Sequence, residues 1–155
     1  LEAMAMTKEA VRVSFAGSPD NPAYADQLKS LARKLSMHDR VKWLGQVSEE
    51  EKRDLYARSL GVIYPPIDED FGYVTLEAML AAKPVITCID SGGPLEFVRD
   101  EETGAVAEAS AESLAEKMDE LWRQRERARQ WGERGRELYR EMKISWANVT
   151  RKILS

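Results

Sequence analysis

Two glutamates, Glu69 and Glu77, flank a glycine near the middle of the chain. Gly72 stands between them, in a segment that is acidic at residues 68–70 and apolar in most positions from residue 73 onward. An ionised carboxylate accepts hydrogen bonds from hydroxyl groups. Glycine carries no side chain, so a ligand can approach its backbone closely. These residue types at this spacing indicate a site that binds a hydroxylated ligand.

The elements around this segment place it at one edge of a sheet. An apolar run at residues 61–64, closed by Pro65 and Pro66, precedes it. A helical pattern over residues 73–82 and a second apolar run at residues 84–89 follow it. The order is strand, loop, helix, strand. Open parallel α/β sheets bind ligands at the carboxyl ends of their strands, which is where this loop would lie.

The spacing of the two glutamates fits a nucleotide-sugar. A helix that begins near Gly72 presents unpaired backbone N–H groups, which suit a diphosphate. Glu77 lies about 7–8 Å further along the helix axis, within reach of the ribose hydroxyls of the same nucleotide. Glu69 lies on the other side of the diphosphate, where an attached sugar would sit. The ordinary alternative is an exposed helix glutamate stabilised by the helix dipole, after a solvated loop and a turn glycine.

The rest of the chain alternates strands with helices. Strands are predicted at residues 11–17, 41–45, 61–64, 84–89 and 103–107. Helices are predicted from Pro22 to about residue 35, from a capping box of Ser48 and Glu51 to residue 59, and from Ser110 onward. In the last of these, the charged residues 123–127 mark a break or an exposed face. A last short helix begins at Ser145. This alternation predicts an α/β fold, a Rossmann-like open parallel sheet with helices on both faces.

Length and composition limit the function classes. The 155 residues form one domain, and the net charge of −4 argues against a dedicated nucleic-acid binder. One cysteine permits no disulfide within the chain. No apolar run reaches the length of a membrane span, so a cytoplasmic location is expected, with peripheral attachment at the inner face of the membrane left open. Residues 1–6 have no periodicity and are interpreted as a cloning scar outside the fold, so the domain comprises residues 7–155.

Several segments together resemble one enzyme family. Residues 69–79 are similar to the E-x7-E signature of family 4 retaining glycosyltransferases. Residues 83–86, 92–98 and 103–104 follow in that family's order and spacing, residues 41–50 resemble its base-binding strand and loop, and Ser145-Trp146 resembles its C-terminal return segment. The resemblance implies a GT-B architecture of two Rossmann-like domains, in which the C-terminal domain holds most of the donor. This chain resembles that C-terminal domain.

The resemblance also implies residue roles. Glu69 would be the catalytic-site residue that binds the hydroxyls of the transferred sugar, and Glu77 would bind ribose. The remaining donor-binding residues would be Phe71, Gly72, Tyr73, Val74 and Thr75 around the sugar and diphosphate, and Gly45 and Val47 beside the base. The family needs no metal ion and no cofactor. The donor would be a UDP- or GDP-sugar, and the acceptor would be a saccharide or a lipid-linked molecule. The base, the sugar and the acceptor are not readable from this chain.

Two departures from the family pattern have structural consequences. Ala82 stands where the family has a glycine that ends the central helix, so an alanine in the left-handed conformation is expected, at a mild cost. The family's first βα unit, which grips the diphosphate, has no match here. Its strand would lie between the strands at residues 11–17 and 61–64. We therefore expect a truncated domain without its acceptor-binding partner, with weakened donor affinity and no transfer by this chain alone. The strands at residues 11–17 and 61–64 would either pair directly, or another chain, as in a dimer, would supply the missing strand.

Three alternatives compete with this interpretation. Asp68, Glu69 and Asp70 form a D-x-D pattern, which binds a metal-diphosphate in the other large glycosyltransferase fold, but the strand–helix order and Glu77 argue against it. A nucleotide-sugar epimerase of the same architecture would bind the same ligand class. A signalling receiver domain is set aside, because its acidic strand ends are replaced here by Ala16-Gly17 and Pro65-Pro66. His38 is expected in a solvated loop or as a charge at the end of a helix, and Trp43, Trp122 and Trp131 are expected in the core.

Overall fold

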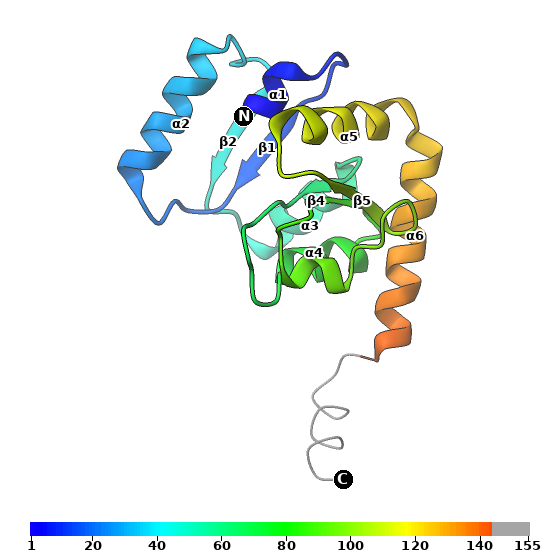
Figure 1. Ribbon diagram of the computed structural model, residues 1–155. Helices are drawn as coiled ribbons and strands as arrows, with labels where there is room; N and C mark the ends of the chain where they lie inside the picture. The colour runs from blue at the N-terminus through cyan, green and yellow to red at the C-terminus, as the bar shows by residue number, and fades with distance from the viewer. Residues whose placement is uncertain (144–155) are drawn as a thin grey trace.

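The computed structural model describes residues 1–143 (Figure 1). The helix predicted from Ser145 lies outside the described residues. The helices are α1 (Glu2–Met6), α2 (Pro22–Lys34), α3 (Glu49–Arg58), α4 (Tyr73–Leu80), α5 (Ala111–Arg123) and α6 (Arg125–Met142). The strands are β1 (Val13–Ala16), β2 (Val41–Gly45), β3 (Val62–Ile63), β4 (Val85–Cys88) and β5 (Gly104–Ala107), with a 3-10 turn, η1, at Gly93–Glu96. All paired strands run parallel, so the predicted α/β class is confirmed.

The helix boundaries follow the local signals in the sequence. The Glu51 backbone N–H donates to Ser48 Oγ over 3.2 Å, and the Ser48 N–H donates to the Glu51 carboxylate over 2.7 Å. This is the predicted capping box of α3. The helical region after Ser110 breaks at Gln124, whose φ of −106° and ψ of 56° separate α5 from α6. The predicted break within residues 123–127 is therefore confirmed.

The strands form two separate sheets. β1 pairs with β2, and β3, β4 and β5 form the other sheet in that order. In the described chain β1 and β3 are not paired, so direct pairing of these two strands was a wrong alternative. The segment before β1 is held by one side chain of α5. The N–H groups of Lys8 and Glu9 donate to the Asp119 carboxylate over 2.8 and 3.0 Å. Completion of the sheet by another chain stays a prediction.

One apolar cluster holds the two sheets together. It contains Val11, which precedes β1, Val41 of β2 in the first sheet, Ile86 and Ala105 in the second sheet, and Trp131 of α6. Burial of apolar surface is non-directional, so this layer can join the sheets without a hydrogen-bonded ladder between them. The same cluster explains why β1 and β3 need not pair.

Residues 1–6 belong to the fold, so their exclusion as a scar outside it was wrong. They form α1, which packs against α5. Ala3 and Met4 are 5% and 3% exposed, within the same apolar cluster. Hydrophobic periodicity needs a window of about 11–18 residues to be visible, and a five-residue helix does not supply one.

Helices cover both faces of the second sheet. In Figure 1, α5 lies on one side of β4 and β5, and α4 lies on the other. Val85 and Ile86 of β4 are each 1% exposed and belong to different apolar clusters, because successive strand residues point to opposite faces. β4 is therefore the buried centre of this sheet.

Ala82 has a φ of 54°, which confirms the expected left-handed residue after α4. Helix α6 crosses this turn closely. A Cβ added at Gly132 would lie 2.1 Å from the Ala82 carbonyl oxygen. Glycine in α6 is therefore required by this close approach of two backbones.

No helix within residues 1–143 is long and apolar enough to cross a membrane.

Candidate functional site

The N-terminus of α4 stands at the carboxyl edge of the second sheet. The loop from β3 leads to Gly72, the N-cap residue, whose φ is 72° and ψ is 56°. Side chains cap α2, α3 and α5, but none caps α4 in the described chain. The first backbone N–H groups of an α-helix have no partner within the helix. This uncapped end therefore offers donors to an anionic ligand.

A second backbone segment fixes the position of Glu69. The Glu69 N–H donates to the Ser91 carbonyl over 3.2 Å, and the Gly93 N–H donates to the Glu69 carbonyl over 2.6 Å. Added Cβ atoms at Gly92 and Gly93 would lie 2.7 Å from the carbonyl oxygens of Glu69 and Asp70, respectively. Only glycine allows this approach, so the Gly92-Gly93 pair sets the shape of the loop before α4.

Glu77 lies on α4 with both carboxylate oxygens bound by α3. Lys52 Nζ donates to Oε1 over 2.8 Å, and the Tyr56 hydroxyl donates to Oε2 over 3.0 Å. Lys52 also contacts Glu49 over 3.1 Å. Burial and the Glu77 carboxylate raise the pKa of Tyr56. Hydrogen bonds to Glu77 and Glu49 raise the pKa of Lys52.

Glu69 also has a tyrosine beside it. Burial and the Glu69 carboxylate raise the pKa of Tyr64, which follows β3. Glu69 itself is partly buried. Each glutamate of the pair is thus accompanied by one tyrosine hydroxyl.

The remaining predicted donor-binding residues differ in exposure. Phe71 and Tyr73 are 39% and 72% exposed, with ring centroids 4.9 Å apart. Val74 is partly buried. Thr75 is fully buried, and its hydroxyl finds no partner in the described chain. A ligand can reach Phe71 and Tyr73, whereas Thr75 is buried and its backbone N–H already donates to the Gly72 carbonyl over 2.9 Å.

The structure joins the predicted base-binding loop to Glu77 through α3. Gly45 ends β2 with a φ of 65° and is exposed, and Val47 is partly buried next to Ser48, the N-cap of α3. Lys52 lies one turn into this helix and reaches Glu77. Gly45 and Val47 are therefore linked to Glu77 by the single helix α3. Glu69 and Glu77 are both partly buried, and Gly72, Thr75 and Leu76 between them are buried.

Sequence reasoning missed Lys52, Tyr56 and Tyr64. Lys52 and Tyr56 are four positions apart, which places them on one face of a helix. That spacing was a usable signal for a shared face. Nothing in the sequence alone shows that this helix face contacts Glu77 in the folded protein.

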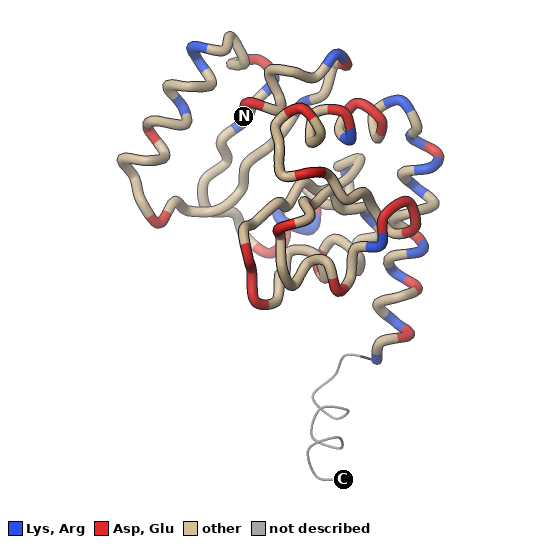
Figure 2. Tube along the Cα trace, viewed as in Figure 1, with Lys and Arg blue, Asp and Glu red and all other residues tan. Residues whose placement is uncertain are grey.

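The loop between β3 and α4 carries the acidic segment at its tip (Figure 2). Asp68 and Asp70 are exposed there. Within residues 1–143, no group of three or more histidine, cysteine or acidic side chains is placed to hold a metal ion. His38 has a side chain that is 70% exposed and lies beside Asp39, in agreement with its predicted place in a solvated loop.

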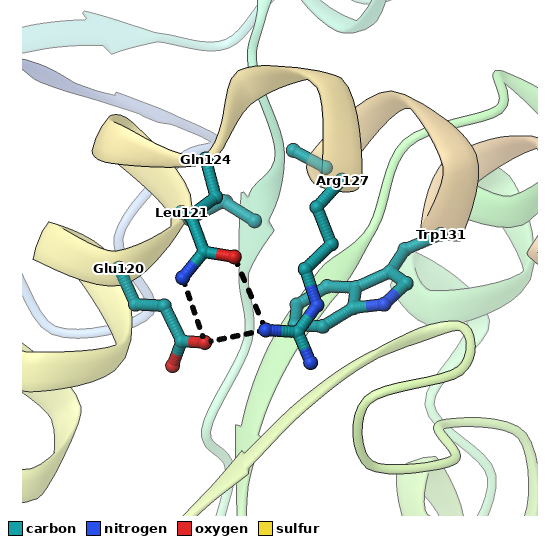
Figure 3. A pocket seen from close by; sticks show the side chains of 6 residues that line it. Glu120, Leu121, Gln124, Arg127 and Trp131 are labelled. Carbon is teal, nitrogen blue, oxygen red and sulfur yellow. Dashed lines mark hydrogen bonds and ion pairs between the residues drawn. The ribbon is translucent and has the colours of Figure 1, made fainter.

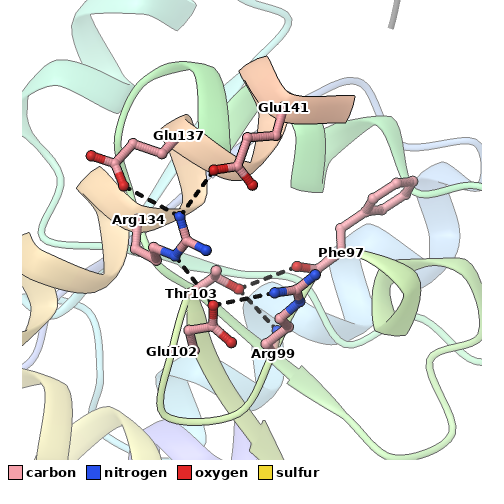
Figure 4. Close-up of polar contacts among 7 residues, drawn as sticks. All are labelled: Phe97, Arg99, Glu102, Thr103, Arg134, Glu137 and Glu141. Atoms are coloured by element: carbon pink, nitrogen blue, oxygen red, sulfur yellow. Dashed lines mark hydrogen bonds and ion pairs between the residues drawn. The ribbon is translucent and has the colours of Figure 1, made fainter. Parts of the chain in front are cut away.

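A polar network supports the aromatic residues under the site (Figure 4). Phe71 packs edge-on against Phe97, with ring centroids 5.6 Å apart. Thr103 Oγ1 donates to the Phe97 carbonyl over 3.2 Å and accepts from the Arg99 N–H over 2.9 Å. Arg134 of α6 reaches the neighbouring Glu102 over 3.2 Å. These contacts link helix α6 to residues 97–103, which include Phe97, against which Phe71 packs.

A shallow hollow at the corner of α5 and α6 has a structural role (Figure 3). Glu120 and Arg127 form an ion pair of 3.0 Å, and the Arg127 guanidinium lies 4.7 Å from the Trp131 ring centroid. Trp131 is 6% exposed and belongs to the core, as predicted. These contacts hold the end of α5 and the beginning of α6 together.

Comparison with known proteins gives a consistent result. The sequence model of the family described as "Glycosyl transferases group 1" matches residues 1–138. The Dictyostelium discoideum alpha-1,3/1,6-mannosyltransferase ALG2 is 34% identical over 119 residues, which cover 74% of this chain and 28% of that protein. The alpha-maltose-1-phosphate synthase of Mycolicibacterium smegmatis is 32% identical over 151 residues, covering 92% of this chain and 38% of that protein.

A solved structure has the same fold. The crystal structure of Anabaena Alr3699/HepE in complex with UDP and glucose superimposes with a TM-score of 0.85 at 22% sequence identity, covering 99% of this chain and 42% of that chain. This chain therefore spans less than half the length of each of these three proteins.

Proposed function

Because the chain belongs to the group 1 glycosyl transferases and has the fold of the C-terminal domain of a GT-B enzyme, we propose that it binds the nucleotide-sugar donor of a retaining glycosyltransferase. The complete enzyme would move a hexose from a UDP- or GDP-sugar to a saccharide or lipid-linked acceptor. The acceptor would be held by a second domain.

One observation carries this proposal: Glu69 and Glu77 stand on either side of the uncapped N-terminus of α4. The backbone N–H groups at that end would bind the diphosphate and stabilise its negative charge as it leaves the sugar. Glu77 would accept hydrogen bonds from the ribose hydroxyls. Glu69, held by Ser91 and Gly93, would accept hydrogen bonds from the transferred sugar and orient it for reaction.

The known proteins support the ligand class. Two relatives are named as a mannosyltransferase and a maltose-1-phosphate synthase, and a structural neighbour was solved with UDP and glucose. The family match is to transferases, so it supports transfer rather than the epimerase alternative. We further propose that diphosphate binding needs no metal ion, and that this chain by itself does not transfer sugar because the acceptor is bound elsewhere. Within residues 1–143, the edges of β1 and β3 that lie outside the two sheets have no partner strand, which supports completion of the sheet by another strand.

Calorimetric titration tests the proposal. UDP, GDP, UDP-glucose and GDP-mannose would each be titrated into the 155-residue chain, with and without EDTA. We expect binding to one nucleotide series, unchanged by EDTA. Binding that requires a divalent ion would favour the D-x-D alternative at Asp68 and Asp70. The absence of binding to every ligand at millimolar concentration would overturn the proposed function.

A further inference from the structure

The face of α3 toward α4 carries two donors for one carboxylate. Lys52 and Tyr56 reach the two oxygens of Glu77 over 2.8 and 3.0 Å. Both donors come from the same helix, four residues apart. A carboxylate with each oxygen held by a separate donor has a fixed orientation about its last side-chain bond.

The bound carboxylate still has room for a ligand. An ionised glutamate has about four acceptor positions on its two oxygens, and the contacts with Lys52 and Tyr56 use one on each oxygen. The Glu77 side chain is 37% exposed, so it is open to solvent. Two acceptor positions therefore remain, which equals the number of free hydroxyl groups, 2′ and 3′, on the ribose of a nucleotide.

The donors are themselves well positioned. The Tyr56 ring packs against the cluster of Ala78, Val85 and Val98, so its hydroxyl is carried by a packed aromatic ring. Lys52 is held between Glu77 and Glu49. A simple exposed ion pair would do little to fix Glu77, but a hydroxyl on a packed ring adds a rigid second contact.

Another residue also holds α3 against α4. Lys83, which follows α4, donates to the carbonyl oxygens of Ala57 and Ser59 over 3.0 and 2.8 Å. The end of α3 is thus tied to the end of α4 by another residue. The contacts to Glu77 have a different consequence, which is the orientation of its carboxylate.

We propose that Lys52 and Tyr56 are positioning residues that hold the Glu77 carboxylate ready to accept the two ribose hydroxyls of the nucleotide. This inference rests on the proposed function, in which Glu77 binds ribose. A flexible side chain that becomes ordered only when the ligand binds lowers the affinity, because its conformational freedom is lost on binding. Here α3 orders Glu77 before the ligand arrives.

The test compares nucleotides with and without the ribose hydroxyls. UDP and GDP, each beside its 2′,3′-dideoxy counterpart, would be titrated into the 155-residue chain and its Tyr56→Phe and Lys52→Gln variants. The unmodified chain should prefer the ribonucleotide. Each variant should bind the ribonucleotide up to about tenfold more weakly, with little change for the dideoxynucleotide. Tyr139→Phe on α6 is the matched control and should leave both affinities unchanged.

A double-mutant cycle separates orientation from general structure. In a Glu77→Ala background, which leaves Tyr56 no side-chain acceptor at position 77, Tyr56→Phe should cause no further loss of ribonucleotide affinity. Lys52→Arg, which keeps a cationic N–H donor, should recover most of the affinity lost in Lys52→Gln. Circular-dichroism melting would confirm that each variant is folded.

The outcomes distinguish the two proposals. If the unmodified chain binds no nucleotide, or binds ribo and dideoxy forms equally, the assignment of Glu77 to ribose fails. If it discriminates between them, and folded Tyr56→Phe and Lys52→Gln variants discriminate equally well, the positioning role is overturned while the proposed function stands.

Discussion

The backbone N–H of Gly93 donates to the carbonyl oxygen of Glu69 over 2.6 Å. This contact joins the turn after β4 to the loop before α4, which carries the candidate sugar-binding glutamate. It is possible only because the two backbones approach without a side chain between them. The loop that presents Glu69 is therefore shaped by residues more than twenty positions away in the chain.

Gly93→Ala should disturb the site and the fold together. The new Cβ would lie 2.7 Å from the Asp70 carbonyl oxygen and 2.8 Å from the Phe71 Cα, and both neighbours are backbone atoms that cannot rotate away. We expect a loss of about 1–3 kcal/mol in the free energy of unfolding and weaker binding of the nucleotide-sugar. Urea unfolding and calorimetry measure the two effects. The control is Gly135→Ala in α6, where the nearest atom would be at an ordinary 3.5 Å and stability should not fall; an equal loss in both variants would contradict this account.

Ala82→Gly should stabilise the protein. Ala82 has a φ of 54°, a conformation that costs an alanine about 1 kcal/mol and costs glycine almost nothing. We expect the free energy of unfolding to rise by about 1 kcal/mol, measured by urea denaturation. Ala57→Gly in the last turn of α3 is the control for the substitution itself and should not raise stability, because glycine loses more conformational freedom on folding than alanine. A loss of stability in Ala82→Gly would show that the left-handed turn is not strained.

Substitution of the two glutamates should separate nucleotide binding from sugar binding. Glu77→Ala should weaken the affinity for bare UDP or GDP, because it removes the acceptor of the ribose hydroxyls. Glu69→Ala should leave the bare nucleotide nearly unaffected and lower the extra affinity contributed by the sugar. Titration of each variant with nucleotide and nucleotide-sugar measures both. An equal loss of bare-nucleotide affinity in the two variants would refute the assigned roles.

Stability at high pH should depend on Tyr56. Its pKa is raised in the folded protein from the ordinary value of 10.0. The unfolded chain therefore releases this proton at a lower pH than the folded chain does, so the contribution is fully present below about pH 10 and is lost as pH rises above it. We expect the free energy of unfolding to fall above pH 10, and to fall less steeply in Tyr56→Phe.

Urea titrations between pH 8 and 11 would measure this slope. Tyr24→Phe, at a tyrosine that is 58% exposed on α2, should keep the slope of the unmodified chain. A Tyr56→Phe variant with the unmodified slope would show that the Tyr56–Glu77 contact does not contribute to the pH dependence.

Local signals in the sequence predicted most of the secondary structure. The capping box of Ser48 and Glu51 defined the start of α3, and the punctuation around Gly72 placed the start of α4. Such signals act between residues that are close in the chain, so they are readable without a structure. The five strands and the parallel α/β class followed from the same kind of pattern.

Contacts between elements were harder to predict. Lys52 and Tyr56 lie 25 and 21 residues before Glu77, and helical periodicity does not reveal which neighbour a polar face meets. Whether β1 and β3 pair was left open between two alternatives for a related reason: a strand pattern shows that a strand exists, but not which edges pair. Residues 1–6 were missed because α1 is too short to show a period.

The division into two sheets also bears on cooperativity. The β1–β2 pair is joined to the β3–β4–β5 sheet by apolar packing and not by backbone hydrogen bonds between β1 and β3 in the described chain. Packing of this kind can loosen without breaking a ladder, so the two parts can open with different free energies. Amide hydrogens of β1 and β2 should then exchange with solvent sooner than those of the buried β4. The glutamates follow β3 and precede β4, so they belong to the more slowly opening part of the domain.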